Sequence, residues 1–274
     1  MTMAAAQPQF GAFAPTAFQK ALIGLFGLPV LRRGFFRRMA SPLVAGLRAG
    51  PLDIERTGLR YRLSIADNVA EQGILFNPAY QQDSLAFVRQ RLRSGATMID
   101  CGANVGQYAL VAAQIVGPLG TVLAVEASPA MAQRLSANVA LSHLDDLITV
   151  APVAVGEAEG ALRFAIDERD GALSHASETG AHTVPMRPLL ALAEDAGLTR
   201  IDLLKLDVEG MEERVLGAFF ADAPERLWPA AMIVEDELSA RWSGDLRGVL
   251  DRCGYRVVGR TKGNVFYEIP TMRQ

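Results

Sequence analysis

Cysteine and long hydrophobic runs are both scarce in this sequence of 274 residues. The two cysteines, Cys101 and Cys253, are too few for a disulfide framework or a cysteine-rich metal site. They are typical of small buried apolar residues in a reducing compartment. The longest charge-free apolar run near the N-terminus, residues 21–31, is interrupted by Pro29 and is shorter than the about 20 residues that cross a bilayer. The sequence therefore predicts neither disulfides nor a transmembrane helix.

A secretory signal and an acidic N-terminal region are also missing. The first positive charge, Lys20, comes too late for a secretory signal and no cleavage pattern follows, so we expect a cytoplasmic protein. Residues 1–52 carry six basic residues and no acid, whereas the rest of the chain has 21 basic and 30 acidic residues, a net charge of −9. An acidic main body argues against nucleic acid as a partner. We expect a basic apolar leader, residues 1–52, mostly helical, followed by one domain, residues 53–274.

Short apolar segments alternate with amphipathic segments along the predicted domain. This alternation predicts an α/β fold: a Rossmann-like, doubly wound, mainly parallel sheet with helices on both faces. The expected helices are residues 81–93, 106–116, 129–142, 188–197, 210–220 and 243–254. The expected strands are residues 59–65, paired with 73–78, then 97–102, 120–128, 148–156, 161–167, 182–186, 201–208, 230–237, 255–260 and 264–269. Only a short turn separates the last two strands, which predicts an antiparallel hairpin at a sheet edge.

A glycine-rich turn joins a strand to a helix in the stretch "MIDCGANVGQYAL", residues 98–110. In a doubly wound sheet such a turn lies at the carboxyl end of a strand, where ligands bind. A dinucleotide site needs G-x-G-x-x-G, which places a pyrophosphate against the helix N-terminus. Here the pattern is D-x-G-x-x-x-G, from Asp100 to Gly106, and a carboxylate before the first glycine would repel a pyrophosphate. The pattern favours S-adenosylmethionine, which carries a sulfonium and an amino group and no phosphate.

A second acid supports a nucleoside cofactor. Glu126 ends the next predicted strand, where a carboxylate can accept hydrogen bonds from both hydroxyls of a ribose. Asp100 and Glu126 should therefore lie on adjacent strand ends. Either acid alone is equally consistent with a helix N-cap or a solvated loop, and it is the pairing of the two that favours a cofactor.

Several motifs together resemble the FkbM family of class I S-adenosylmethionine-dependent methyltransferases. They are "IDCGANVGQYAL", "VEASPAMAQRLSANV", "VAPVAVGEAEGALRF", "IDLLKLDVEGMEERVL", and "IVEDE" with the "GNVFYEI" ending, and they cover about residues 70–270. The K-x-D-x-E-G-x-E string is the most family-specific. The resemblance implies O-methylation of a hydroxyl on a sugar, a glycan or a natural product. It also implies the cofactor-binding residues Asp100, Gly102, Ala103, Asn104, Gly106, Glu126, Ala127, Val153 and Ala154, with the last two near the adenine.

The acids in and after "KLDVEGMEE" are candidates for the chemistry. Methyl transfer to a hydroxyl requires alignment of the nucleophile with the methyl carbon and removal of the hydroxyl proton. Strand periodicity places Lys205, Asp207 and Glu209 on one side, and the next strand ends in Glu235. Asp207 is the leading candidate for the base, with Lys205 tuning it and Glu209 or Glu235 positioning the acceptor. His175 and His182 of the polar segment 169–182 are weaker candidates for the base, and an exposed loop histidine is the favoured interpretation of each.

The same residues have structural interpretations. Lys205 can pair with a neighbouring acid, and Glu209 and Glu212 can cap a helix beginning near Gly210, whose N-terminus favours negative charge. Some of the acids can instead hold Mg²⁺ or Ca²⁺, although we expect no metal. Two other functions stay open at this point: a non-catalytic cofactor-binding or scaffold protein with this fold and, less favoured, an NAD-type oxidoreductase.

The basic leader has two interpretations. The favoured one is a small helical cap over the sheet or the acceptor site. The alternative is an amphipathic segment on an anionic membrane, with Phe35 and Phe36 in the interface and the arginine pairs at the headgroups. That peripheral contact with the inner face of a membrane would suit a lipid-linked glycan. The expected partners are thus a small-molecule or glycan acceptor and no nucleic acid.

Overall fold

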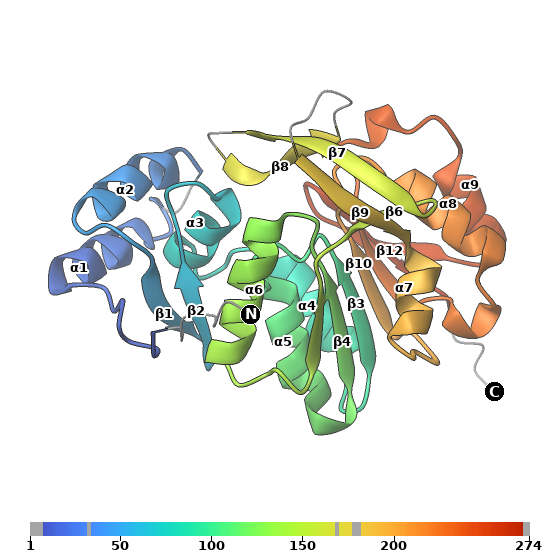
Figure 1. Ribbon diagram of the computed structural model, residues 1–274, viewed down its shortest axis with the longest axis horizontal. Helices are drawn as coiled ribbons and strands as arrows, with labels where there is room; N and C mark the ends of the chain where they lie inside the picture. The colour runs from blue at the N-terminus through green and yellow to red at the C-terminus, as the bar shows by residue number, and fades with distance from the viewer. Residues whose placement is uncertain (1–7, 32–33, 168–169, 177–181, 271–274) are drawn as a thin grey trace, which may run out of the picture.

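The centre of the protein is a seven-stranded sheet (Figure 1). The computed structural model describes residues 8–31, 34–167, 170–176 and 182–270. Across the sheet the strands are β12 (Arg256–Arg260), β13 (Asn264–Glu268), β11 (Ala231–Glu235), β10 (Leu203–Leu206), β3 (Thr97–Cys101), β4 (Thr121–Val125) and β5 (Ile148–Ala151). The five strands from β11 to β5 run parallel, while β13 runs antiparallel to both of its neighbours.

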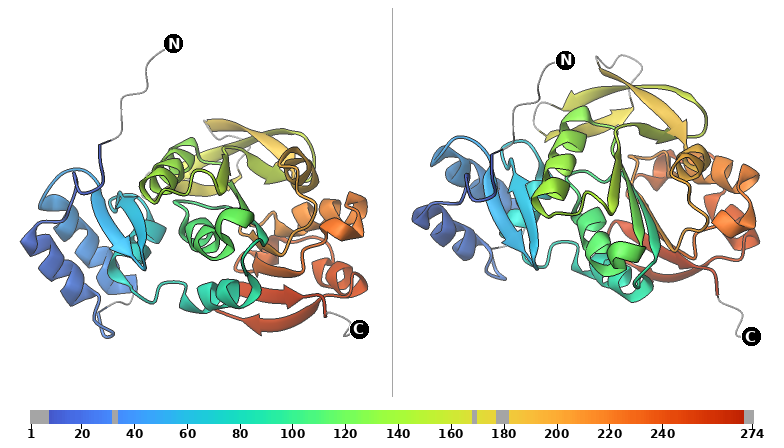
Figure 2. Two further views of the ribbon diagram at one scale, coloured as in Figure 1. Left: turned by 90° about the horizontal axis from the view of Figure 1, so that it is seen from below. Right: turned by 60° about the horizontal axis from the view of Figure 1, so that its bottom comes forward.

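Helices cover both faces of this sheet (Figure 2). One face packs against α4 (Gln82–Arg91), α5 (Gln107–Val116) and α6 (Pro129–Leu141), and the other against α7 (Leu189–Asp195), α8 (Glu212–Asp222) and α9 (Leu246–Arg252). Met98 of β3 belongs to the first hydrophobic core and the next residue, Ile99, to the second, as alternation along a strand requires. Short 3-10 helices are η1 (Gly117–Leu119), η2 (Glu225–Leu227) and η3 (Ser239–Arg241).

The predicted doubly wound α/β fold is confirmed, and so is the C-terminal antiparallel hairpin of β12 and β13. The strand order reverses at β3 and β10, because β4 and β5 continue to one side and β11 to the other. Ligands of doubly wound sheets bind in the crevice outside the carboxyl ends of the strands at such a reversal. The glycine-rich turn follows β3 and the segment "DVEG" follows β10, so both lie at this crevice.

The predicted pairing of residues 59–65 with residues 73–78 is wrong. The partner of β2 (Leu59–Leu63) is β1 (Leu52–Arg56), across a tight turn in which Thr57 and Gly58 have φ of 51° and 81°. Two adjacent residues with positive φ are what a two-residue hairpin with the right twist requires. Residues 69–76 are instead the helix α3 (Val69–Phe76), because the side chain of Asn68 accepts a hydrogen bond from the backbone of Glu71 and caps it.

The predicted strand at residues 148–156 is also two strands rather than one. β5 ends at Ala151, and Pro152, which has no backbone N–H for a ladder, separates it from β6 (Ala154–Gly156). β6 belongs to a second sheet with the order β6-β9-β7-β8, formed with β7 (Gly160–Asp167), β8 (Asp170–Ala176) and β9 (His182–Pro188). The break at Pro152 turns Val153 and Ala154 toward the carboxyl ends of β3 and β4, where both residues line a pocket.

The N-terminal helices α1 (Ala17–Phe26) and α2 (Gly34–Gly46) pack side by side at one end of the molecule (Figure 1). The buried Gln19 side chain donates a hydrogen bond to the carbonyl oxygen of Val44 at 3.0 Å and ties the two helices together. Both helices contact α3. Among the described residues no helix combines the length and the apolar character needed to span a bilayer.

Candidate active site

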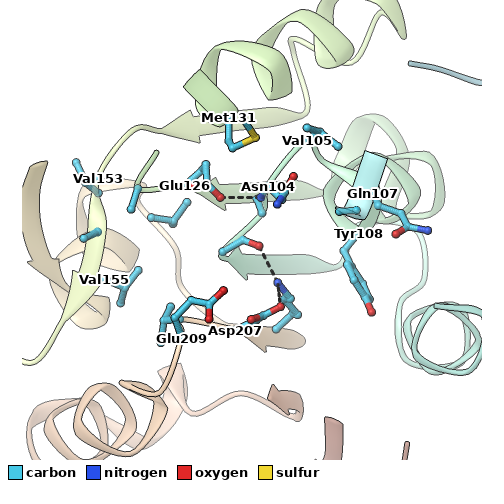
Figure 3. Close-up of a pocket in the computed structure, with 18 of the residues that line it drawn as sticks. Asn104, Val105, Gln107, Tyr108, Glu126, Met131, Val153, Val155, Asp207 and Glu209 are labelled. Atoms are coloured by element: carbon cyan, nitrogen blue, oxygen red, sulfur yellow. Dashed lines mark hydrogen bonds and ion pairs between the residues drawn. The ribbon is translucent and has the colours of Figure 1, made fainter. Parts of the chain in front are cut away.

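A pocket lies at the carboxyl ends of β3, β4 and β10, where the strand order reverses (Figure 3). It holds about 1100 Å³ of empty space, its open mouth included. We call it the first pocket. Most residues predicted for the cofactor line it: Gly102, Ala103, Asn104, Glu126, Ala127, Val153 and Ala154. Lys205, Asp207 and Glu209, predicted for catalysis, line it as well.

Gly102 allows the ends of β3 and β10 to approach each other. Its φ is 73°, and a Cβ at this position would overlap the backbone carbonyl oxygen of Asp207. Gly106, with φ of 96°, serves packing in the same way, because a Cβ there would collide with the side chains of Leu110 and Leu135. Gly106 is not part of the pocket wall, so its contribution is to the turn and the helix packing rather than to ligand contact.

Glu126 holds the glycine-rich turn in place. Its Oε2 accepts a hydrogen bond from the backbone N–H of Asn104 at 2.7 Å (Figure 3). Its Oε1 accepts one from the backbone N–H of Ser128 at 2.8 Å. Burial raises the pKa of Glu126, and these two hydrogen bonds oppose that rise. A carboxylate oxygen has a second lone pair, so Glu126 can still accept hydrogen bonds from hydroxyl groups in the pocket.

Asn104 is held from two sides. Its φ of 49° lies in the left-handed region, which asparagine tolerates better than most residues. The side chain of Asn68, at the start of α3, donates a hydrogen bond to Oδ1 of Asn104 at 2.9 Å. The helix α3 is thereby connected directly to the turn that follows β3.

Lys205 connects the ends of β3 and β10. Its Nζ donates hydrogen bonds to the carbonyl oxygens of Cys101 at 3.2 Å and Gly102 at 2.8 Å. It also pairs with Asp207 at 3.2 Å and with Asp100 at 3.6 Å. Burial alone would lower the pKa of Lys205, but Asp207 and Asp100 outweigh burial and raise it. Lys205 is therefore a fixed cation and not a base, and its predicted pairing with a neighbouring acid is confirmed.

Asp100 lies behind the pocket wall. Its side chain is fully buried, and neither carboxylate oxygen has a hydrogen-bond partner among the described residues. Burial raises the pKa of Asp100, and the charge of Lys205 opposes the rise. Asp100 was predicted at the cofactor, but it reaches the pocket only through Lys205, whose position it helps to hold.

A second, more open hollow adjoins the first pocket. We call it the second pocket; it has about 1750 Å³ of empty space, open solvent included. It lies between the segment before α4, the end of β11 and the turn between β12 and β13. Five residues line both pockets: Tyr80, Gln81, Tyr108, Asp207 and Glu209. The remaining charged residues of the second pocket are Asp83, Glu235, Glu237 and Lys262, so its lining is strongly acidic.

Glu209 lies where the two pockets meet, beside Asp207 (Figure 3). Its φ of 57° is in the left-handed region, which is uncommon outside glycine and asparagine and often marks functional sites. Burial, together with the charges of Asp207 and Glu212, raises the pKa of Glu209 to about 7. The carboxylate of Glu209 has no hydrogen bond or ion pair to another described residue, unlike that of Asp207.

Two further acids near this junction have different environments. Glu235 lines only the second pocket; its Oε2 is buried without a hydrogen-bond partner among the described residues, and burial with the neighbouring acids raises its pKa to about 8. Glu212 is fully buried, and its Oε1 accepts hydrogen bonds from the backbone of Val208 and Gly210. The helix α8 begins at Glu212 after the N-cap residue Met211 and has no side-chain cap, so the predicted capping role of Glu209 and Glu212 is wrong. Glu212 instead holds the turn before the helix, and Glu209 is left for other contacts.

Several pocket residues were not predicted. Met131, Val155 and Leu162 line the first pocket, and Tyr80, Gln81 and Tyr108 line the passage between the pockets. Tyr108 lies in the stretch of residues 98–110 that the sequence analysis identified, near the start of the helix after the turn. Its position there could have predicted that it faces the pocket. Tyr80 and Gln81 lie between α3 and α4, outside any motif.

Two predictions are not decided by the described residues. The histidines His175 and His182 belong to a segment whose side chains lie outside the described part of the chain. For a metal, no group of three or more histidine, cysteine, aspartate and glutamate side chains within the described part of the chain is arranged to hold an ion.

Comparison with known proteins decides the family. The family model described as the methyltransferase FkbM domain matches residues 100–257, more than half of the chain. The chain belongs to the FkbM methyltransferase family. The matched residues include Glu126, Lys205, Asp207, Glu209 and Glu235. No curated protein matches the sequence significantly.

Solved methyltransferases resemble the chain at low sequence identity and low TM-score. An S-adenosylmethionine-dependent O-methyltransferase from Thermotoga maritima is 13% identical, covers 71% of this chain and 67% of its own, and has a TM-score of 0.41. A methyltransferase from Geobacter sulfurreducens is 13% identical, covers 69% of this chain and 78% of its own, and has a TM-score of 0.43. An S-adenosylmethionine-dependent methyltransferase from Aquifex aeolicus is 14% identical, covers 70% of this chain and 93% of its own, and has a TM-score of 0.39. The assignment to the FkbM family rests on the matched domain.

Membership of the FkbM family places the protein among the S-adenosylmethionine-dependent methyltransferases. This agrees with the interpretation of the D-x-G-x-x-x-G turn, and the family match gives no support to an NAD-type oxidoreductase. The donor set of the first pocket fits the cofactor: a carboxylate, Glu126, for hydroxyl groups, and apolar side chains, Met131, Val153 and Val155, for a flat ring.

Proposed function

We propose that this FkbM methyltransferase methylates a hydroxyl group of a sugar, a glycan or a natural product, lipid-linked glycans included. The observation that carries the proposal is the junction of two pockets at Asp207 and Glu209. One pocket has the lining expected for the cofactor. The other is lined by carboxylates, which accept hydrogen bonds from hydroxyl groups and so suit a polyhydroxylated acceptor.

The residues that would hold S-adenosylmethionine lie along the first pocket. Glu126 would accept hydrogen bonds from the ribose hydroxyls, Gly102 and Asn104 would lie at the methionine end, and Val153 and Val155 would flank the adenine. When bound, S-adenosylmethionine supplies a methyl carbon activated by a sulfonium leaving group. The residues of the chain are then needed to orient the acceptor oxygen and to accept its proton.

Glu209 is the base in this proposal. Asp207, the leading candidate from the sequence, is ion-paired with Lys205 at 3.2 Å, so one of its oxygens is already engaged by an ammonium. Glu209 lies at the same junction with an unengaged carboxylate and a pKa near 7, where a base is most effective at neutral pH. Asp207 then orients the acceptor hydroxyl, and Glu235 contacts the rest of the acceptor in the second pocket.

Calorimetric titration followed by a transfer assay tests the proposed function. We expect purified protein to bind S-adenosylmethionine and S-adenosylhomocysteine and not NAD⁺. With S-adenosylmethionine carrying a labelled methyl group, label should enter sugars and glycans with free hydroxyl groups. The same acceptors with their hydroxyls blocked by prior methylation serve as the matched control and should gain none.

Three outcomes would contradict the proposal. Equal labelling of blocked acceptors would place the methyl group on an atom other than a hydroxyl oxygen. Cofactor binding without transfer to any hydroxyl in a broad panel would favour the non-catalytic cofactor-binding protein. Binding of NAD⁺ alone would overturn the reaction class.

A further inference from the structure

The exposed side of α2 carries a stripe of apolar side chains. Phe35, Met39, Leu43 and Leu47 are 68%, 53%, 57% and 44% exposed. They recur every four residues, which places the three on the helix in one stripe, and Leu47 follows directly after the helix ends. The opposite side of α2 packs into the protein through the buried residues Ala40, Ser41 and Val44. A surface helix normally exposes polar side chains on its outer face, so this stripe is unusual.

The neighbouring helix α1 and the loop after it also expose large apolar side chains. Phe18, Leu25 and Leu28 are 61%, 48% and 51% exposed, and Val30 is 73% exposed. Eight of the twelve large apolar side chains that are exposed among the described residues lie on α1, on α2, between them or directly after α2. We call these eight residues the N-terminal surface: Phe18, Leu25, Leu28, Val30, Phe35, Met39, Leu43 and Leu47. Contiguous apolar patches of this kind mark interaction sites.

Charge limits what can cover the N-terminal surface. Residues 1–52 contain six basic residues and no acid, whereas the rest of the chain has a net charge of −9. Lys20 on α1 and Arg38 on α2 are exposed beside the apolar side chains. A symmetric dimer that paired this surface with its own copy would bring basic residues against basic residues, which is unfavourable. An array of apolar and basic side chains without acids is complementary to anionic lipid headgroups above an acyl layer.

The dimensions of the two helices agree with contact in the plane of a membrane. α1 has 10 residues and α2 has 13, which is short of the about 20 residues needed to cross a bilayer. Short amphipathic helices of this length can lie in the interface with their apolar faces in the headgroup and acyl boundary. We propose that the N-terminal surface docks the protein on an anionic lipid membrane.

Docking would bring both pockets near the lipid surface. Both N-terminal helices pack against α3, and α3 contributes Ala70 and Ile74 to the first pocket and Val69 to the second. An acceptor anchored in the membrane could therefore reach the junction at Glu209 while the protein stays docked. This consequence rests on the proposed function, whereas the docking itself does not.

Vesicle co-sedimentation of the full chain tests the docking. The probes are vesicles of phosphatidylcholine alone and of phosphatidylcholine mixed with phosphatidylglycerol. We expect binding to the mixed vesicles at least about tenfold tighter than to the neutral ones, and weaker in high salt because surface charges are screened. A variant with Phe35→Ser, Met39→Ser, Leu43→Ser and Leu47→Ser should bind the mixed vesicles at least about tenfold more weakly than the wild type.

A matched control separates the surface from general stickiness. Leu119→Ser with Val257→Ser and Val258→Ser removes exposed apolar side chains elsewhere, and binding should stay at the wild-type level. Lys20→Glu with Arg38→Glu should weaken binding to mixed vesicles and leave the neutral ones unaffected. Calorimetric binding of S-adenosylmethionine to every variant shows that the catalytic domain is intact, so loss of folding is not mistaken for loss of docking.

Three results would overturn the inference. One is equal sedimentation of the wild type and the four-serine variant with mixed vesicles. Another is a wild type that binds no vesicles at low salt. The third is a wild type that forms a dimer in sedimentation equilibrium which the four-serine variant does not form, because a second copy would then occupy this surface. A failure of the methyl-transfer assay alone affects the proposed function and leaves the docking result standing.

Discussion

The two pockets at the carboxyl edge of the sheet share a boundary but are built differently. In the first pocket the acid Glu126 is engaged by two backbone N–H groups, and the acid behind the wall, Asp100, faces Lys205. In the second pocket Glu235 has a buried oxygen without any hydrogen-bond partner among the described residues. Apart from Glu209, which lines both pockets, the acids at the first pocket are held by backbone N–H groups or by Lys205, so its shape is set before a ligand arrives. A pocket with unengaged acids depends on its ligand, or on a proton, to satisfy them.

The strongest test of this comparison is at the junction. We expect Glu209→Gln to lower kcat by about 10² to 10⁴, because an amide cannot accept the acceptor proton. The affinity for S-adenosylmethionine should change by less than about threefold, since Glu209 makes no hydrogen bond to the first pocket's other residues. Steady-state kinetics and calorimetry measure the two quantities.

The pH dependence gives the same test a second readout. Only the deprotonated form of Glu209 accepts a proton, so wild-type activity should rise with pH around the pKa of about 7. The rise should vanish in Glu209→Gln. Asp207→Asn is the comparison variant: if it loses the pH-dependent rise and Glu209→Gln keeps it, the base is Asp207.

The next test acts on the first pocket alone. Glu126→Gln should weaken S-adenosylmethionine binding by about tenfold to a hundredfold, because charged hydrogen bonds to the turn and to a ribose are lost together. The KM for the acceptor should stay within about twofold of the wild type. Glu157→Gln replaces an exposed carboxylate outside both pockets and is expected to change neither quantity. An unchanged cofactor affinity in Glu126→Gln would remove Glu126 from the cofactor site.

A smaller effect is expected in the second pocket. Glu235→Gln should raise the acceptor KM by about tenfold, the size expected for one charge-assisted hydrogen bond, and leave cofactor affinity unchanged. Because the pKa of Glu235 is about 8, this difference should appear above pH 8, where the carboxylate is ionised and accepts the hydrogen bond, and should shrink below it. The acceptor KM of the wild type should therefore fall as the pH rises through about 8. A loss of cofactor affinity instead would mean that the two pockets are not separate.

The smallest effect is expected at Asn68. Its side chain caps α3 and also donates a hydrogen bond to Asn104. Asn68→Ser keeps a capping oxygen but is too short to reach Asn104, so Tm should stay close to the wild type while cofactor affinity falls about threefold to tenfold. Asn68→Ala should lower both. Equal cofactor affinity in wild type and Asn68→Ser would show that the contact with Asn104 has no part in binding.

The sequence was informative about elements with a strong local signal. Most of the order of strands and helices from Thr97 onward was predicted, because short apolar strands alternate with amphipathic helices and each is bounded by glycine or proline. The strand β8 was missed, since residues 170–176 were expected in a polar loop. The pairing of β2 was predicted wrongly, because "GILF" is apolar enough for a strand and its helical state depends on the cap at Asn68 and on packing. The strand at residues 148–156 was predicted too long because the break at Pro152 was not given enough weight.

Within the site, too, some features were predictable from local sequence and others depended on the fold. D-x-G-x-x-x-G and Glu126 identified the class of cofactor, because local spacing at a strand end dictates which groups face a ligand. Residues that lie far apart along the chain meet only in the fold: Tyr80 before α4, Glu235 at the end of β11 and Lys262 in the last hairpin line one pocket. Whether an acid is engaged or available was decided by burial and by neighbours such as Lys205, so Asp100 and Glu209 carry the same charge in the sequence and different roles in the structure. The sequence by itself determined which side chains stand at each strand end, because these are set by local spacing. Only long-range packing decided which carboxylate is left without a partner.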